Sequence, residues 1–221
     1  MSFEVLAGSK VGPLLLRRQS PAISPPLKWP GGKRWQIPHL LPYWQAHRHR
    51  RLVEPFSGGL AVSLGLSPER ALLNDVNPHL INLYRNIQRG LRITTPLRNS
   101  RTHFASCRFR FNKLIASGQA QTKEAATLFY FLNRTAFNGL CRFNQQGQFN
   151  APFGQNKRVA HTRDFAAYQP VFERWDFHCG DFASLPIEPD DFIYADPPYD
   201  VEFTQYSQQG FGWNDQVRVA D

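Results

Sequence analysis

The sequence predicts an α/β protein, built as a doubly wound parallel sheet that carries an inserted, mostly helical subdomain with a β-hairpin. Three observations lead to this prediction. Short apolar runs that suit buried strands alternate with segments of helical periodicity near both ends of the chain. Polar or glycine-containing turns follow these runs. A strongly basic segment without this rhythm lies between them. With 221 residues, 42% of them hydrophobic, the chain is long enough for one domain with a sizeable core.

The first strand is expected at residues 52–54, Leu-Val-Glu, where Pro55 ends an apolar run. Small residues follow at 57–59, Ser-Gly-Gly. Residues 60–66 then suit a helix that packs back on the strand. Together these segments form a βα unit.

A second unit begins with the apolar run at residues 71–74, which ends in Asp75. Asn77 is expected to cap a helix that has Pro78 at its first position. The helix that follows has one apolar face, made by residues at helical spacing: Leu80, Leu83, Tyr84 and Ile87.

The basic middle segment, residues 84–163, holds 14 Lys and Arg residues and a single acid, Glu124, which gives it a net charge of +13. The rest of the chain has a net charge of −4. Such a concentration of charge is typical of a surface that binds a polyanion. Asn, Gln and aromatic residues interrupt the charges, which favours nucleic acid over a membrane surface. Residues 144–148 read as the tip of a hairpin, with Phe143 and Phe149 facing each other.

The strand pattern resumes at residues 175–179, which alternate in polarity before a turn at Gly180-Asp181. The last clear strand covers residues 191–195. We therefore expect an extension over residues 1–24, a catalytic domain over 25–83 and 164–221, and a target-recognition subdomain over 84–163.

Asp196-Pro197-Pro198-Tyr199 follows this last strand. In open α/β sheets the carboxyl ends of the strands line the ligand crevice. The two prolines lack N–H donors, so this segment offers free carbonyl acceptors. The acid and the neighbouring carbonyl could therefore accept both hydrogens of an exocyclic amine. The tyrosine ring could stack on a base. The alternative is a rigid turn without chemistry.

Several other site types are disfavoured. Gly32-Lys33 is no phosphate loop, because Leu27 and Arg34 stand where that motif needs glycine and Ser/Thr. His47 and His49 lie among arginines that would repel a metal ion, and the three cysteines form no C-x-x-C pair, so we expect no metal. No apolar run approaches the ~20 residues of a membrane span, and no secretion signal is present. We expect a soluble, cytoplasmic protein.

Five motifs occur in a fixed order: residues 28–33, 54–59, 74–77, 180–182 and 196–199. With the basic segment between the third and fourth, the chain resembles the Dam-type (D12 class) adenine-N6 DNA methyltransferases. The resemblance runs from about Pro25 to Asp221. It includes residues 133–144 and 149–154, which look like the DNA-contacting hairpin of that family.

The resemblance implies a Rossmann-like methyltransferase that uses S-adenosyl-L-methionine and acts on double-stranded DNA with its target adenine flipped out, GATC being the first sequence to test. Catalysis would fall to Asp196, Pro197, Pro198 and Tyr199. The expected cofactor-binding residues are Trp29, Gly31, Gly32, Lys33, Glu54, Phe56, Gly58, Gly59, Asp75, Asp181 and Phe182. The expected DNA-binding residues are Arg134, Asn138, Arg142, Asn144, Lys157 and Arg158, with Arg142 matching the guanine-reading arginine of the family.

Two alternatives stay open: an adenine methyltransferase that acts on RNA, and a DNA-binding remnant without catalysis. Only 22 residues follow Tyr199, whereas the family's sheet continues through three more strands. We therefore expect a C-terminally truncated chain with a long exposed edge strand, low solubility and weak methyl transfer. The complete protein is expected to be a monomer.

Overall fold

The structure is a computed structural model that describes residues 23–94, 97–154, 159, 162–198 and 211–220. Three of the expected site residues, Tyr199, Lys157 and Arg158, lie outside these ranges, as does nearly all of the expected extension over residues 1–24.

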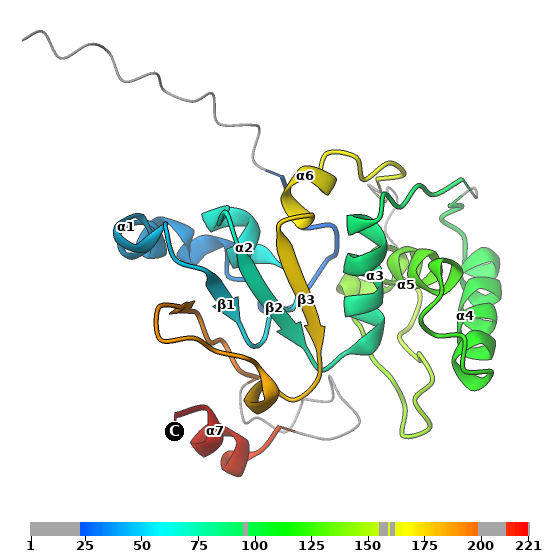
Figure 1. The fold of residues 1–221 in the computed structure, drawn as a ribbon. Helices are drawn as coiled ribbons and strands as arrows, with labels where there is room; N and C mark the ends of the chain where they lie inside the picture. Colours follow the sequence, from blue (N-terminus) through cyan, green and yellow to red (C-terminus); the bar gives the residue numbers. More distant parts are fainter. Residues whose placement is uncertain (1–22, 95–96, 155–158, 160–161, 199–210, 221) are drawn as a thin grey trace, which may run out of the picture.

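A four-stranded parallel sheet forms the centre of the fold (Figure 1). Its strands are β1 (Leu52–Glu54), β2 (Ala71–Asp75), β3 (Trp175–Cys179) and β4 (Phe192–Ile193), in the order β3-β2-β1-β4. The chain proceeds outward from β1 in one direction and then returns to pair β4 on its other side, which is the doubly wound arrangement that the sequence predicts. This arrangement creates a crevice beyond the carboxyl ends of β1 and β4.

The register confirms the four predicted strands but shortens the last one. Leu52 pairs with both Ala71 and Phe192, and Ala71 pairs in turn with Trp175. β4 has two residues instead of the five expected, because its pairing with β1, its only partner among the described residues, covers only Phe192 and Ile193. The expectation of a long apolar edge strand is therefore wrong in its length.

Helices cover both faces of the sheet. The 3-10 helix η1 (Arg34–Gln36) leads into α1 (Ile37–His47), which packs with α2 (Ala61–Leu66); α3 (Pro78–Gln88) and α6 (Gln169–Phe172) pack against β3. Figure 1 shows α1 and α3 on opposite sides of the sheet.

The start of α3 follows its sequence signals. The side-chain oxygen of Asn77 accepts hydrogen bonds from the N–H groups of His79 and Leu80, at 3.0 and 3.3 Å. Such a cap satisfies backbone donors that have no partner within the helix. All four residues of the predicted apolar face are fully buried: Leu80, Leu83, Tyr84 and Ile87.

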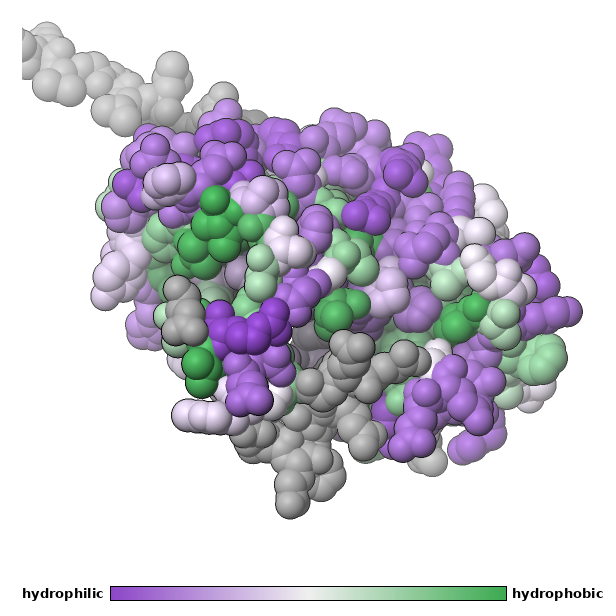
Figure 2. Space-filling model, turned by 60° about the horizontal axis from the view of Figure 1, so that its bottom comes forward, coloured by the Kyte–Doolittle hydropathy of each residue, from purple (hydrophilic) through white to green (hydrophobic). Residues whose placement is uncertain are grey.

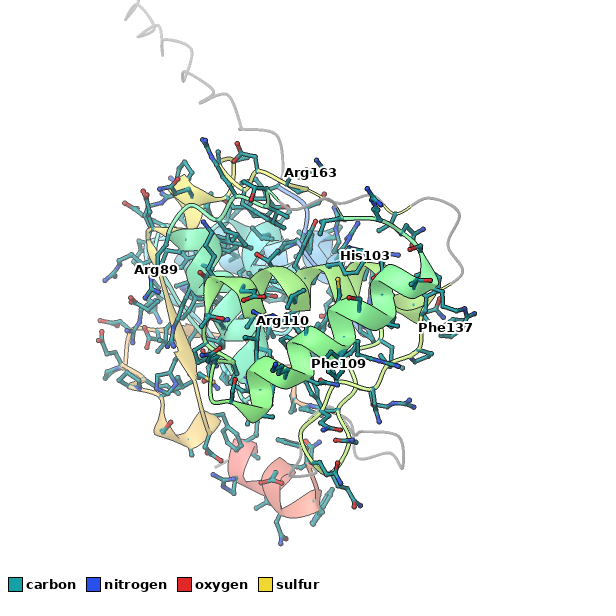
Figure 3. The ribbon with its side chains drawn as sticks, turned by 90° about the vertical axis from the view of Figure 1, so that its right-hand side faces the viewer. Arg89, His103, Phe109, Arg110, Phe137 and Arg163 are labelled. Atoms are coloured by element: carbon teal, nitrogen blue, oxygen red, sulfur yellow. The ribbon has the colours of Figure 1, made fainter. Side chains whose placement is uncertain are left out.

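The basic segment contributes two helices, α4 (Arg101–Ala116) and α5 (Lys123–Thr135), followed by the 3-10 turn η2 (Phe137–Gly139). α5 packs against α3 and α4 (Figures 1 and 3). The expected boundary at residue 84 falls inside α3, so one continuous helix belongs to both the sheet layer and the inserted helices.

The predicted hairpin is present. Phe143 and Phe149 form an antiparallel bridge, with their ring centroids 5.6 Å apart. At the tip, Asn144 donates its backbone N–H to the Gln148 carbonyl at 2.9 Å. The ring of His79 stacks on Phe143 at 4.9 Å and thereby joins the hairpin to α3.

The remaining elements lie beyond β3 and β4. The 3-10 turn η3 (Phe182–Ser184) follows β3, and α7 (Trp213–Ala220) occupies the carboxyl-terminal side of the sheet (Figure 1). Within the described part of the chain, every helix is too short or too polar to cross a membrane.

Candidate active site

A cavity of about 360 Å³ lies beyond the carboxyl ends of the strands. Its wall includes every residue that the sequence assigned to the cofactor, together with Asp196, Pro197 and Pro198. Figure 2 views the molecule from this side, where polar and apolar residues are both exposed. The topology explains this gathering, because the motifs follow parallel strands whose carboxyl ends share one edge of the sheet.

Asp196 forms an ion pair across the cavity with Lys33. The Lys33 Nζ lies 2.6 Å from Oδ2 of Asp196 and also donates to the Gly31 carbonyl at 3.1 Å. Asp196 follows β4, whereas Lys33 precedes η1. The pair therefore connects the two ends of the fold across the cavity.

Glu54, the last residue of β1, carries a buried carboxyl group in the cavity wall. Burial raises its pKa to about 8, and the negative charge of Asp196 raises it further. The hydrogen bond that Ser63 Oγ donates to Oε1 at 2.6 Å acts in the opposite direction and lowers it. A carboxyl group with such a pKa is protonated at neutral pH.

Asp75, at the end of β2, joins two neighbouring segments. Its Oδ2 accepts from the Gly58 N–H at 3.1 Å and its Oδ1 from the Asn77 N–H at 2.9 Å. Burial raises the pKa of Asp75 to about 6, while these two hydrogen bonds lower it. Each carboxylate oxygen has two lone pairs, so Asp75 retains acceptor capacity toward a ligand.

Gly58 and Gly59 have a structural role that the sequence did not reveal. A Cβ atom at Gly58 would lie 2.7 Å from Nε1 of Trp29, and one at Gly59 would lie 2.6 Å from the Trp29 Cβ. Gly58 also has a φ of +45°, which disfavours other residues. These glycines are needed so that Trp29 can pack on the turn after β1, whereas the sequence analysis placed them only among the expected cofactor-binding residues.

Asp181 and Phe182 form the wall of the cavity beyond β3. Asp181 accepts from the Ala183 N–H at 2.9 Å, and the ring centroid of Phe182 lies 5.2 Å from that of Phe56. These two phenylalanines present aromatic surface to the cavity.

α7 contributes residues that sequence reasoning missed. Asp215 lines the cavity, as does Phe211 just before the helix, and Gln216 donates from Nε2 to the Pro198 carbonyl at 2.8 Å. Arg218 contacts Asp181, with Nη2 2.6 Å from Oδ1. The sequence indicated the start of a helix here, but it gave no signal for the contacts of this helix with the two turns.

The expected DNA-binding residues that are described lie on α5, η2 and the hairpin. Arg142 is exposed and donates to the side-chain and backbone oxygens of Asn150, at 2.8 and 3.0 Å. Asn144 Oδ1 accepts from the backbone of Gln146 and Gln148, so this residue caps the hairpin turn. Asn138 is exposed and adopts a φ of +50°. Arg134 is half-buried near Lys28, whose pKa is lowered by burial and then by the charge of Arg134.

Metal ligands do not gather in the described residues. Throughout those ranges, no group of three or more His, Cys, Asp or Glu side chains could hold an ion.

Comparison with known proteins identifies the family. Residues 29–221 match the D12 class of N6 adenine-specific DNA methyltransferases. The chain is 33% identical over 225 residues to the type II methyltransferase M1.LlaDCHI of Lactococcus lactis subsp. cremoris, covering 94% of this chain and 78% of the relative. It is 35% identical over 213 residues to a DNA adenine methylase of Vibrio cholerae, covering 88% of this chain and 74% of the relative.

A phage protein is also similar. The chain is 36% identical over 209 residues to the DNA N-6-adenine-methyltransferase of Escherichia phage P1, a match that covers 87% of this chain but only 27% of the phage protein. The motifs quoted from the sequence lie within the matched range, and the parallel sheet brings them to one cavity. The chain therefore belongs to the D12 class of N6 adenine-specific DNA methyltransferases.

Proposed function

We propose that this adenine-specific methyltransferase transfers the methyl group of S-adenosyl-L-methionine to the N6 amine of an adenine flipped out of duplex DNA. The observation that supports this most strongly is the sharing of one cavity. Asp196 and Pro197, which suit an amine, line the same space as the aromatic and acidic residues that suit a nucleoside cofactor.

The residues of the cavity fit such a cofactor. Phe56 and Phe182 offer aromatic surface for a purine ring, and Asp75 offers carboxylate acceptors for ribose hydroxyls. A volume of about 360 Å³ lies in the range of small-molecule sites. When bound, S-adenosyl-L-methionine would supply a methyl group activated by the positive sulfonium sulfur.

The turn after β4 would orient the amine. An aromatic amine is a poor nucleophile, because its lone pair is delocalised into the ring. Hydrogen bonds from its two hydrogens to Asp196 and to the Pro197 carbonyl would favour a pyramidal nitrogen with its lone pair directed at the methyl carbon. Such positioning, together with fixed acceptors, accounts for most of the rate gain in reactions of this type.

Asp196 can accept the amine while it keeps its ion pair. Lys33 contacts Oδ2, whereas Oδ1 accepts no hydrogen bond from any residue within the described ranges. Oδ1 is therefore the oxygen that we assign to the substrate amine.

Sequence reading is assigned to the hairpin. A bidentate contact between Arg142 and guanine would supply about 1–3 kcal/mol of discrimination, and Arg142 would exchange its hydrogen bonds with Asn150 for those with the base. Phosphates would be bound by Arg134, Lys157 and Arg158. The hairpin would be positioned against the DNA with the help of Asn138 and Asn144. Flipping the adenine costs a few kcal/mol, and Tyr199 would stack on the extruded base.

The test is transfer of a labelled methyl group from S-adenosyl-L-methionine to three substrates: a duplex with GATC sites, a duplex of the same composition without them, and a structured RNA. Nucleosides from the digested product are identified by mass spectrometry. We expect N6-methyldeoxyadenosine from the GATC duplex. Methylation of the RNA alone would support the RNA alternative, and absence of transfer to every substrate would support the DNA-binding remnant.

A further inference from the structure

α7 connects the two turns that border the cavity. Gln216 donates from Nε2 to the carbonyl of Pro198, beyond β4, at 2.8 Å. Two residues later, Arg218 pairs with Asp181, beyond β3, at 2.6 Å. β3 and β4 are the outer strands in the order β3-β2-β1-β4, so α7 bridges the two turns across the cavity.

The helix geometry suits this bridge. With 3.6 residues per turn, positions two residues apart project to nearly opposite sides of an α-helix. Gln216 and Arg218 therefore reach turns on either side of α7 at the same time. Asp215 of the same helix lines the cavity.

The contact with Pro198 is well suited to fix the catalytic turn. Neither Pro197 nor Pro198 has an N–H group, so hydrogen bonds can hold this segment only through its carbonyls. A hydrogen bond to the Pro198 carbonyl fixes the orientation of the peptide unit that follows the two prolines. The neighbouring Pro197 carbonyl and Asp196 then stay directed at the substrate amine.

We propose that Gln216 is a positioning residue for methyl transfer, which it promotes by anchoring the Asp196-Pro197-Pro198 turn through the Pro198 carbonyl. This inference rests on the proposed function. We expect loss of the Gln216 contact to lower the rate of methyl transfer, since a displacement of a reacting group by about 1 Å can lower a rate roughly 100-fold.

Arg218 has a different role at the other end of the bridge. Its guanidinium lies 4.7 Å from the ring centroid of Phe182 and also pairs with Asp215 at 3.0 Å. Its hydrogen bond lowers the pKa of Asp181 and keeps that carboxylate charged. Arg218 thus holds the cofactor wall of the cavity, whereas Gln216 holds the amine side.

The experiment compares four variants of the full 221-residue chain with the wild type. Gln216→Leu removes the donor, and Gln216→Glu keeps the shape but places a carboxylate against the Pro198 carbonyl. Arg218→Leu removes the contact at the other turn. Val217→Ala, at an exposed position between the two, is the matched control. Measured quantities are kcat at saturating DNA and cofactor, the Kd of S-adenosylhomocysteine by calorimetry, and Tm.

We expect both Gln216 variants to lower kcat by about 10- to 100-fold, with the Kd of S-adenosylhomocysteine within about threefold of wild type. Arg218→Leu should show the opposite pattern: the Kd of S-adenosylhomocysteine should rise by only about fivefold, because exposed ion pairs contribute little, while kcat stays nearly normal. Val217→Ala should match the wild type in both. If Gln216→Leu does not fold, Gln216→Glu carries the same test.

Gln216 variants with wild-type kcat, or with a loss confined to cofactor affinity, would overturn the positioning role while the proposed function stands. An equal loss of kcat in Arg218→Leu would also overturn it, because α7 would then act as a general support. A wild-type chain that methylates no adenine would overturn the proposed function and the positioning role together.

Discussion

Lys33 and Asp196, 163 positions apart in the sequence, meet at 2.6 Å across the cavity. Lys33 is largely buried, and it is fixed further by its hydrogen bond to the Gly31 carbonyl. The segment before η1 and the turn after β4 are therefore held together by a charged hydrogen bond, which is stronger than a neutral one. Lys33 can orient the Asp196 carboxylate before any substrate arrives.

The first prediction follows from this pair. Lys33→Met should lower the kcat of methyl transfer by about 10-fold or more, because Asp196 loses the partner that fixes its orientation. DNA affinity should stay within about twofold of wild type, since Lys33 lies in the cavity wall and is not among the expected DNA-binding residues. Single-turnover kinetics and DNA titrations separate the two quantities. A normal kcat in Lys33→Met would mean that the ion pair has no part in orienting Asp196.

The raised pKa of Glu54 should make the stability of the protein depend on pH. Its pKa rises to about 8 in the folded protein, from an ordinary value near 4.5. Between these two values the folded state binds a proton that the unfolded chain has released. This contribution to stability is fully present below about pH 4.5 and is lost as the pH rises through about 8.

Glu54→Gln should remove that dependence, because the amide keeps the shape without a titrating proton. Comparing the variant with the wild type by denaturant unfolding, we expect their difference in unfolding free energy to change by a few kcal/mol between about pH 5 and pH 9, at about 1.4 kcal/mol per unit of pKa displacement. Asp75 is present in both proteins, so its contribution to the pH dependence cancels in the difference between their unfolding free energies. A constant difference across this range would show that Glu54 titrates normally.

Gly59 is predicted to be intolerant of any side chain. Gly59→Ala would place a methyl group 2.6 Å from the Trp29 Cβ, so that Trp29 or the turn after β1 must move. We expect a loss of about 1–3 kcal/mol of stability, which is typical of overpacking, and weaker cofactor binding. Gly212→Ala is the matched control, because a Cβ there has no heavy atom within 4 Å. Equal melting temperatures for the two variants would contradict the role of Gly59.

Two expected DNA-binding residues of the basic segment, Arg142 and Lys157, should have separable effects on DNA binding. Arg142→Ala should reduce the preference for target over non-target duplexes, because it removes a base contact worth about 1–3 kcal/mol. Lys157→Ala should weaken binding to both duplexes about equally and lower the salt slope by roughly one, as expected for a phosphate contact. Fluorescence anisotropy at several salt concentrations measures both. A uniform loss of affinity in Arg142→Ala would rule out its role in reading a base.

Local signals made much of the fold predictable. The Asn77 cap and the apolar face of α3 are determined within a few residues, and the structure contains both. Three of the four strands lie in short apolar runs, whereas β3 alternates in polarity, and Pro55 and Gly180 directly follow β1 and β3. Because the motifs follow parallel strands, their meeting at one edge of the sheet could also be expected from topology.

Contacts between distant segments could not be predicted in this way. Nothing near Gln216 in the sequence indicates that it reaches Pro198, because the contact depends on where α7 lies after a long connection. The glycines after β1 correctly predicted a turn. Their packing against Trp29 could not be predicted, because Trp29 belongs to an earlier segment of the chain. The short β4 likewise reflects its pairing, because only Phe192 and Ile193 pair with β1, and local hydrophobicity does not report which residues pair.

The most direct test of the account is the Asp196→Ala variant, assayed for methyl transfer to duplex DNA beside the binding of S-adenosylhomocysteine and of DNA. Asp196 accepts a hydrogen bond from Lys33 and, in this account, one from the substrate amine. We predict that methyl transfer is abolished while both binding constants stay within a few-fold of wild type, because the carboxylate acts mainly on the flipped amine. Turnover near the wild-type rate in Asp196→Ala would contradict the assignment of this turn as the catalytic centre.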